Sequence, residues 1–186
     1  MGKTIWKINV LIVAIIAALI LSVGNGSAET GVTDTAICIG MWSPLSGPVS
    51  LLGQSARDAV QVWAKQIKDR GGIHGRKIKF ISYDDAGSPQ EAQTAIRRLI
   101  DQDKVFMLIS GSISGSVLPV RQIITQKKVP FVSSISSNVN LMKPFSRYIF
   151  RIYANEDHQA LGIVDWIVGN EKMKAVAIIY NSNDYG

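Results

Sequence analysis

The sequence predicts an α/β fold in which a parallel sheet carries helices on both faces. Short apolar runs alternate along the chain with longer segments whose apolar residues recur at helical spacing. A helix between two strands returns the chain to the starting edge of the sheet, so consecutive strands run parallel. With 186 residues and 47% hydrophobic composition, the chain can form one such domain and part of another.

The elements follow one another in a regular order. Apolar or alternating runs predict strands at residues 36–42, 77–83, 105–109, 129–133, 148–153 and 175–180. Between the first two strands, apolar residues from Ala56 to Ile67 recur at helical spacing, and Gly71-Gly72 ends that helix. Before the third strand, Ser88 to Glu91 form a capping box with proline at the first helical position. The buried face predicted for the helix that starts there consists of Ala92, Ala95, Ile96 and Leu99. Asn155 and the two acids after it start the last predicted helix.

The first 28 residues are predicted to be a cleaved signal peptide. Lys3 and Lys7 give a basic start, Val10 to Leu21 is an apolar run, and Gly26-Ser27-Ala28 offers small residues before a cut. The run is short for a membrane-spanning helix, which needs about 20 apolar residues. An uncleaved anchor is the alternative. Export by this route would place the protein in the periplasm or another extracytoplasmic space.

The remaining residues are expected to divide into one complete lobe and the beginning of another. Residues 29–153 supply five strands and their helices, which suffice for a ligand-binding lobe. Residues 154–186 supply only one helix and one strand. A strand and turn do not make a natural domain end, so the second lobe is expected to be truncated in this chain.

Two serine-rich turns form the candidate site. Ser110 to Ser116 follows the third predicted strand, and Ser133 to Asn138 follows the fourth. In open α/β sheets, ligands bind at the carboxyl ends of the strands. Small residues let the backbone approach a bound group, while hydroxyls and free N–H groups suit a carboxylate or another small anion. The alternative is that these serines only cap helices.

The residues of an enzyme are not visible, and no catalytic residue is predicted. Gly111 to Gly115 approaches the serine-hydrolase elbow, but its central residue is Ile113. His74 and His158 are placed in a loop and in a first helical turn, away from the serines. Asp84-Asp85 are neighbours at a strand end, so their side chains point apart. These observations favour a binding module over an enzyme.

Metals, cofactors and nucleic acid are also not expected. Cys38 is the only cysteine, so no intramolecular disulfide forms, and two histidines cannot complete the usual four-ligand zinc site. The predicted role of Cys38 is that of a small buried hydrophobic residue. The net charge is +6, but the basic residues are scattered rather than arranged with aromatics on one face. No nucleic-acid partner is therefore predicted.

Several motifs resemble the leucine/isoleucine/valine-binding proteins of bacterial ABC importers. They are Pro44-Leu45-Ser46-Gly47-Pro48, Gly71-Gly72-Ile73-His74-Gly75-Arg76, Tyr83-Asp84-Asp85-Ala86, Phe150-Arg151 and Asn183-Asp184-Tyr185-Gly186. The resemblance runs from about Ala36 to Gly186. It implies the type I periplasmic binding fold, in which two similar α/β lobes close on an amino acid; here the first lobe would be complete and the second only begun.

The resemblance also implies ligand-binding residues. Ser114 matches the serine that receives the ligand carboxylate. The turn that holds carboxylate and ammonium is matched by Ile135, Ser136 and Ser137. Tyr185 matches an aromatic residue from the second lobe. Backbone amides and hydroxyls of the first lobe would bind the carboxylate, and closure of the second lobe would exclude water.

The function implied by the resemblance is an extracytoplasmic receptor for branched-chain or similar amino acids. Its partners would be the amino acid and the membrane permease of an ABC importer. One alternative is the same fold tuned to another small carboxylate or amide, and another is the sensory ligand-binding domain of a receptor. Leu52 departs from the aromatic residue usual before Gly53, which alters one packing contact at the site.

Overall fold

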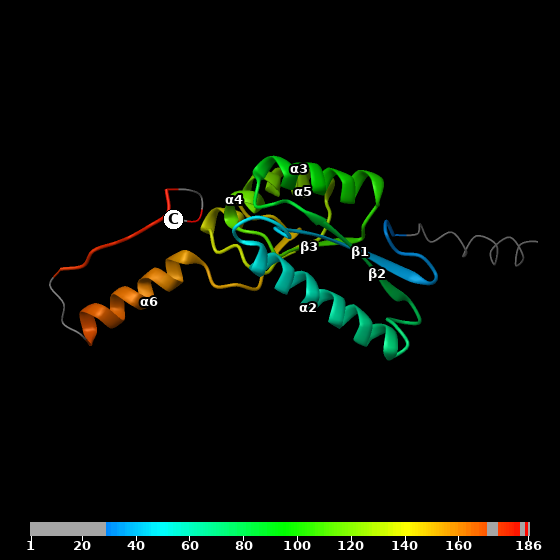
Figure 1. The fold of residues 1–186 in the computed structure, drawn as a ribbon, viewed down its shortest axis with the longest axis horizontal. Helices are drawn as coiled ribbons and strands as arrows, with labels where there is room; N and C mark the ends of the chain where they lie inside the picture. The colour runs from blue at the N-terminus through cyan, green and yellow to red at the C-terminus, as the bar shows by residue number, and fades with distance from the viewer. Residues whose placement is uncertain (1–28, 171–174, 183–184, 186) are drawn as a thin grey trace, which may run out of the picture.

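The computed structural model describes residues 29–170, 175–182 and 185, and the predicted signal peptide at residues 1–28 lies outside them. Five parallel strands form one sheet in the order β2-β1-β3-β4-β5 (Figure 1). They are β1 (Ala36–Ser43), β2 (Lys77–Asp84), β3 (Met107–Ser110), β4 (Phe131–Ser133) and β5 (Ile149–Arg151). Five of the six predicted strands are thus confirmed, each within a few residues.

Helices cover both faces of the sheet, as the sequence predicts. The longer helices are α2 (Ser50–Asp69), α3 (Pro89–Arg97) with its π-helical continuation Arg98–Gln102, α5 (Arg121–Lys127) and α6 (Glu156–Gly169). Short helices are α4 (Ser114–Val117) and the 3-10 turns Leu118–Val120 and Val139–Leu141. Figure 1 shows α3 and α5 on one face and α2 on the other. None of the helices in the described residues is long and apolar enough to span a membrane.

Local signals set most helix ends. Ser88 is the N-cap of α3, its hydroxyl accepts a hydrogen bond from the Glu91 N–H, and Pro89 is the first helical residue. Asn155 caps α6 by accepting from the His158 N–H at 2.8 Å. Gly72, with φ of 86°, follows α2, where a residue with a side chain would be strained.

The core lies mainly on the face covered by α3 and α5. Trp42 and Phe131 are fully buried there, with ring centroids 5.0 Å apart. The buried face predicted for the helix after Ser88 is confirmed, because its four apolar residues are at most 5% exposed: Ala92, Ala95, Ile96 and Leu99. Burial of this apolar area is the main force that holds the helices to the sheet.

The opposite face is covered only in part. Met41, Ile109, Val132 and Phe150 lie in register across β1, β3, β4 and β5. Met41 is fully buried beneath α2, but Phe150 is 54% exposed. The helix predicted from the apolar spacing between Ala56 and Ile67 is present as α2, but Trp63 of that helix remains 41% exposed. One helix cannot cover a five-stranded sheet.

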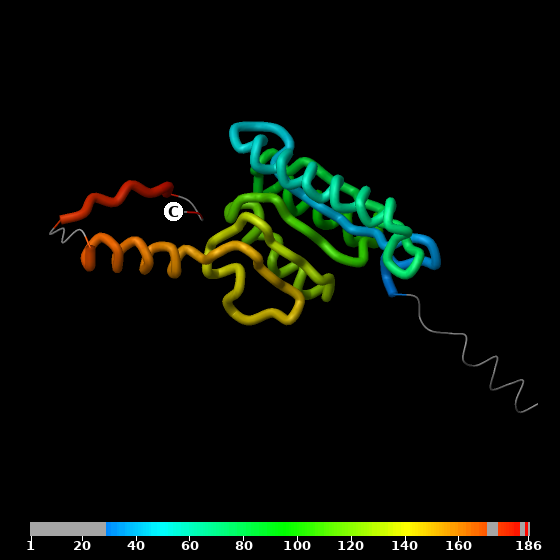
Figure 2. The backbone as a smooth tube through the Cα atoms, turned by 90° about the horizontal axis from the view of Figure 1, so that it is seen from below, coloured from blue at the N-terminus to red at the C-terminus, as the bar shows by residue number. Residues whose placement is uncertain are grey.

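The sixth predicted strand is wrong for the described residues. The segment 175–182 has no strand pairing, and Figure 2 shows it running back beside α6 rather than joining the sheet. Ile178 and Ile179 are 81% and 100% exposed. An apolar run becomes a strand only where a neighbouring strand pairs with its backbone groups. The proposed division of the chain at residue 153 stays a prediction.

Candidate functional site

The two serine-rich turns meet at the carboxyl edge of the sheet. β3 and β4 are paired neighbours, so the turns that follow them lie side by side. Ser114 Oγ and Ser136 Oγ are 3.1 Å apart and share one hydrogen bond. Both residues are 1% exposed in the described structure. This contact brings residues 22 positions apart together, and that the two turns form a ligand site stays a prediction.

The first turn is hydrogen-bonded to a buried acid, Asp85. The Ser112 hydroxyl donates to Asp85 Oδ2 at 2.6 Å, and Asp85 Oδ1 accepts from the Gly87 N–H at 2.9 Å. The Asp85 side chain is fully buried. Burial raises the pKa of Asp85 above its ordinary value, and the hydrogen bond from Ser112 opposes that rise. Asp85 therefore positions the turn that carries Ser114.

The neighbouring acid, Asp84, contacts a different turn, which lies between β1 and α2. Its carboxylate accepts from the N–H groups of Leu45 at 2.7 Å and Ser46 at 3.3 Å. Burial alone would raise the pKa of Asp84, but hydrogen bonding from the Ser46 side chain and from the N–H groups of Ala86, Leu45 and Ser46 outweighs it and lowers the pKa. The expectation that the two acids point apart is confirmed, and each fixes a different turn.

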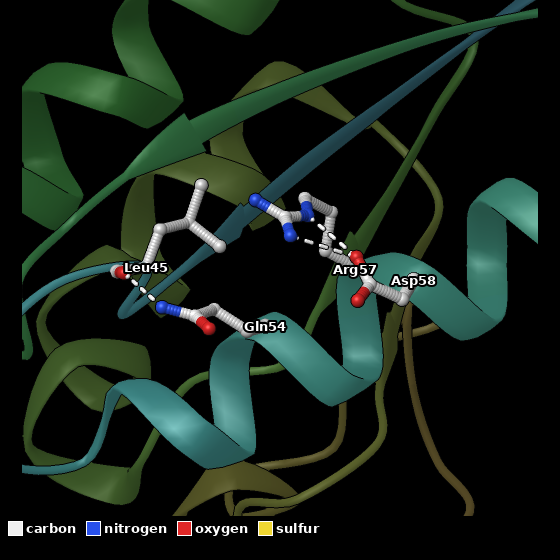
Figure 3. Close-up of polar contacts among 4 residues, drawn as sticks. All are labelled: Leu45, Gln54, Arg57 and Asp58. Carbon is white, nitrogen blue, oxygen red and sulfur yellow. Dashed lines mark hydrogen bonds and ion pairs between the residues drawn. The ribbon is translucent and has the colours of Figure 1, made fainter.

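The turn before α2 is also tied to that helix. The Gln54 amide donates to the Leu45 carbonyl at 2.8 Å. Figure 3 shows Gln54 reaching from α2 to this turn, while Arg57 pairs with Asp58 further along the same helix. Leu52 lies two residues before Gln54 in α2 and forms part of the cavity wall.

The second turn is fixed by Arg151 and by the start of α6. The Arg151 guanidinium donates to the carbonyl oxygens of Ser137 and Asn138 at 2.9 and 3.0 Å. The Ser137 carbonyl also accepts from the Glu156 N–H at 3.2 Å. The Ser137 hydroxyl donates to Glu156 Oε1 at 2.8 Å. The backbone and the hydroxyl of Ser137 are thus both bound by α6.

A cavity of about 490 Å³ opens above the serine pair. Its walls are mainly apolar and are formed by Val49, Leu52, Ile113, Ser114, Ile135, Tyr153, Asn181 and Tyr185. Three of the five predicted ligand-binding residues, Ser114, Ile135 and Tyr185, line it directly. Ser136 contacts Ser114 from behind. A concave, mostly apolar site with a few polar groups is typical of small-molecule binding.

Ser137 lies in a second, adjoining cavity of about 430 Å³. Glu156 and Gln159 of α6 line this second cavity with it. Asn181 and Tyr185 line both cavities, so the two spaces meet at these residues. Within the turn from 135 to 137, Ile135 therefore lines the first cavity and Ser137 lines the second.

Sequence reasoning missed Glu156 and gave Asp85 only a turn role. Both look like ordinary turn or helix-start residues in the sequence, because acids are common in such positions. Their contacts join residues 19 and 27 positions apart. The only available signal was that Asp85 follows the second predicted strand and Glu156 the fifth, and the carboxyl ends of parallel strands meet at the edge of the sheet that carries the serine-rich turns.

The remaining candidates show no sign of metal chemistry. Within the described ranges, no group of three or more histidine, cysteine, aspartate or glutamate side chains could hold a metal ion. His74 and His158 are exposed. Cys38 is 7% exposed, and burial raises the pKa of its thiol. Its predicted role as a small buried hydrophobic residue is confirmed.

The chain is similar to known proteins over most of its length. The family model described as periplasmic binding protein matches residues 36–186. The Leu/Ile/Val-binding protein BraC3 of Rhizobium johnstonii is 29% identical over 150 residues, which are 81% of this chain and 41% of that protein. The chain spans less than half the length of the curated relatives it matches first.

Solved structures share the fold. The branched-chain amino acid transporter substrate binding protein LivJ from Streptococcus pneumoniae, in complex with isoleucine, matches with a TM-score of 0.69 at 23% identity, over 74% of this chain and 39% of that chain. A solute binding protein of an ABC transporter from Rhodopseudomonas palustris, in complex with 3,4-dihydroxybenzoic acid, matches with a TM-score of 0.66 at 26% identity, over 73% of this chain and 36% of that chain. The described sheet and helices therefore have the fold of these proteins.

Proposed function

Because the chain belongs to the periplasmic binding protein family, we propose that it is an extracytoplasmic receptor that binds branched-chain or similar amino acids and delivers them to the membrane permease of an ABC importer. The observation that carries this proposal is the hydrogen-bonded pair Ser114 and Ser136, of which Ser114 lines an apolar cavity. The Leu/Ile/Val-binding relative and the isoleucine complex of LivJ support the choice of ligand.

The serine pair suits the ligand carboxylate. Two hydroxyls that share one hydrogen bond hold two protons, so one proton remains to donate. A hydrogen bond to a carboxylate is stronger than one between neutral groups, and more so where water is excluded. The 1% exposure of both serines meets that condition.

The apolar wall suits an aliphatic side chain. Val49, Leu52, Ile113 and Ile135 surround the space above the serine pair, and Tyr153 adds an aromatic ring. A buried methylene contributes about 0.8 kcal/mol, so a leucine-sized side chain gains a few kcal/mol from this wall. Residues 154–186 are proposed to begin the second lobe, whose closure would cover the rest of the ligand.

A second candidate ligand is an aromatic carboxylic acid. The complex of a structural neighbour with 3,4-dihydroxybenzoic acid favours it, as do Tyr153 and Tyr185, which can stack on a ring. The same serine pair would receive its carboxylate. The two candidates differ in the rest of the ligand, because the amino acid carries an ammonium and an aliphatic chain.

Titration of the isotope-labelled full-length protein tests both candidates by NMR. We expect leucine, isoleucine and valine to shift the amide signals of Ser114 and Ser136 saturably, and 3,4-dihydroxybenzoate to shift them less. Stronger binding of the dihydroxybenzoate would favour the second candidate. If none of these ligands shifts the two amides, the proposed function is wrong.

A further inference from the structure

Cations that are scattered in the sequence gather at the edge of the sheet opposite the serine-rich turns. Because all five strands are parallel, the chain enters each strand at one edge of the sheet and leaves it at the other. Five exposed cations lie in the segments that enter β3, β4 and β5, namely Lys104, Lys127, Lys128, Lys143 and Arg147. This entry edge is therefore rich in positive charge.

Three of these cations line one cavity. Lys104, Lys127 and Lys128 border a space of about 430 Å³, together with the acids Glu29 and Asp101. Lys127 Nζ donates to Asp101 Oδ1 at 2.7 Å. Among the described residues, neither Lys104 nor Lys128 forms an ion pair. The cavity therefore keeps more positive than negative charge, and this balance attracts an anion.

Two of the three lysines have a backbone conformation that favours glycine. The φ angle is 53° at Lys104 and 57° at Lys128. Lys128 ends α5, a position at which a left-handed residue is usually glycine. A side chain costs stability in this conformation, yet both lysines stand at the same cavity. This coincidence points to a role for the two charges that the turns themselves do not require.

An exposed aromatic ring lies between the other two cations. Phe145 is 84% exposed, and Lys143 and Arg147 flank it two residues away on either side. A lipid surface suits this combination, because cations contact anionic headgroups while an apolar side chain enters the acyl boundary. A small soluble anion would gain nothing from the ring.

The loop that carries Phe145 is fixed to α5. The Arg121 guanidinium donates to the carbonyl oxygens of Leu141, at 2.9 Å, and Pro144. The hydroxyls of Thr125 and Ser146 share a hydrogen bond of 3.1 Å. In Figure 2 this loop is the yellow segment beside α5. The loop is therefore joined to the helix whose end carries two of the lysines at the cavity.

We propose that this edge of the lobe binds the anionic phospholipids of a bilayer, through an entry-edge surface that consists of Lys104, Lys127, Lys128, Lys143, Phe145 and Arg147. The cavity would receive the phosphate of a headgroup, and Phe145 would enter the acyl boundary. This inference goes beyond the proposed function. It does not depend on which ligand the protein binds, because the surface lies at the edge opposite the serine-rich turns.

Vesicle sedimentation tests the inference. The full-length protein is used without residues 1–28, because the apolar run from Val10 to Leu21 would itself bind lipid. We expect the protein to sediment with vesicles of phosphatidylcholine and phosphatidylglycerol but not with phosphatidylcholine alone. Binding should weaken as salt is added, because salt screens charges at a surface. Equal binding to both compositions, or no binding to the anionic vesicles, would overturn the proposal.

Lys104→Gln combined with Lys128→Gln removes two charges from the cavity. Each cation near an anionic membrane contributes roughly fivefold in affinity, so this double variant should bind the vesicles about tenfold more weakly or worse. Lys65→Gln combined with Lys68→Gln is the matched control. It removes two charges from α2, on the face of the sheet opposite α5 (Figure 1). Equal losses in the two double variants would mean a general charge effect and would overturn the assignment of the surface.

Glycine at the same two positions separates binding from folding. Lys104→Gly combined with Lys128→Gly should weaken vesicle binding as the glutamine pair does. It should also raise the urea midpoint, because glycine adopts the left-handed conformation without strain. A lowered midpoint would make the two lysines structural residues and would overturn their assignment to lipid binding.

Phe145→Ser distinguishes a bilayer from a soluble anion. Because Phe145 is exposed, the change should leave folding intact. We expect the variant to bind the anionic vesicles more weakly and to respond to inorganic phosphate as the unmodified protein does, measured by NMR at the amides of Lys104 and Lys128. If vesicle binding is unchanged and phosphate alone shifts these amides, the cavity binds a soluble anion and the membrane proposal is wrong.

Discussion

The hydroxyl of Ser112 donates a 2.6 Å hydrogen bond to the fully buried carboxyl group of Asp85. This contact joins the turn after β2 to the turn after β3, across the strand β1 that lies between them in the sheet. It holds the turn that leads into Ser114 from beneath. The position of the proposed carboxylate site therefore depends on an acid that does not line its cavity.

The two adjacent acids are expected to affect stability in opposite pH directions. The pKa of Asp85 is raised in the folded protein, so its contribution is fully present below its ordinary pKa of 3.8 and is lost as the pH rises through the folded pKa. The pKa of Asp84 is lowered, so its contribution is present above 3.8 and is lost as the pH falls through the folded pKa.

Urea denaturation of Asp84→Asn and Asp85→Asn from pH 3 to pH 7 measures both slopes. As the pH rises, the stability of the unmodified protein should fall relative to Asp85→Asn and should rise relative to Asp84→Asn. Each substitution also removes hydrogen bonds. For the buried Asp85 we expect about 1–3 kcal/mol of destabilisation. Slopes of the same sign for both residues would contradict the assigned environments.

Gly111→Ala is expected to destabilise the protein by about 1–3 kcal/mol. A Cβ atom at Gly111 would lie 2.5 Å from the Ala56 Cβ and 2.8 Å from the Met41 Cε. Either α2 or the serine turn must therefore shift. Gly115→Ala is the control, because a Cβ at Gly115 meets no atom within 4 Å. Its effect should be small, and equal effects of the two changes on the urea midpoint would refute the close packing at Gly111.

Two phenylalanines on neighbouring strands should respond differently to truncation. Phe131 is fully buried against Trp42, so Phe131→Ala should cost about 3–5 kcal/mol. Phe150 is 54% exposed on the partly covered face, so Phe150→Ala should cost well under half as much. Thermal or urea unfolding measures both. A larger loss at Phe150 would show that this face is covered in solution.

Ser114→Ala should weaken ligand binding by about tenfold to a hundredfold, because it removes a hydrogen bond to a charged group worth roughly 1.5–3 kcal/mol. Ser116→Ala is the matched control, since Ser116 is buried two residues away and does not line the cavity. Titration calorimetry of the full-length protein compares them. Unchanged affinity in Ser114→Ala would reject this residue as a carboxylate ligand.

The predicted signal peptide can be checked directly. Lys3, Lys7 and the apolar run from Val10 to Leu21 predict cleavage after Ala28. N-terminal sequencing of protein from the periplasm or culture medium should begin at Glu29. Recovery of a membrane-bound protein that retains Met1 would favour the uncleaved anchor instead.

The order of the elements and the location of the site could be predicted from the sequence. Apolar periodicity reports which residues of a segment face the interior, so β1 to β5 and the buried side of α3 were found within a few residues. The serine turns followed, because the carboxyl ends of parallel strands meet at one edge. The segment 175–180 was misassigned because its apolar run carries no information about whether a partner strand lies beside it.

The sequence by itself determined the fold class and the edge of the sheet at which a ligand would bind. Both follow from local properties, namely the periodicity of apolar residues and the chemistry of turns. Only the tertiary structure decided which hydroxyl pairs with which group. The bonds from Ser112 to Asp85, from Ser114 to Ser136 and from Ser137 to Glu156 join residues 27, 22 and 19 positions apart. Such pairings depend on strand order, register and side-chain rotamers, because a hydrogen bond requires its atoms to approach within about 3 Å.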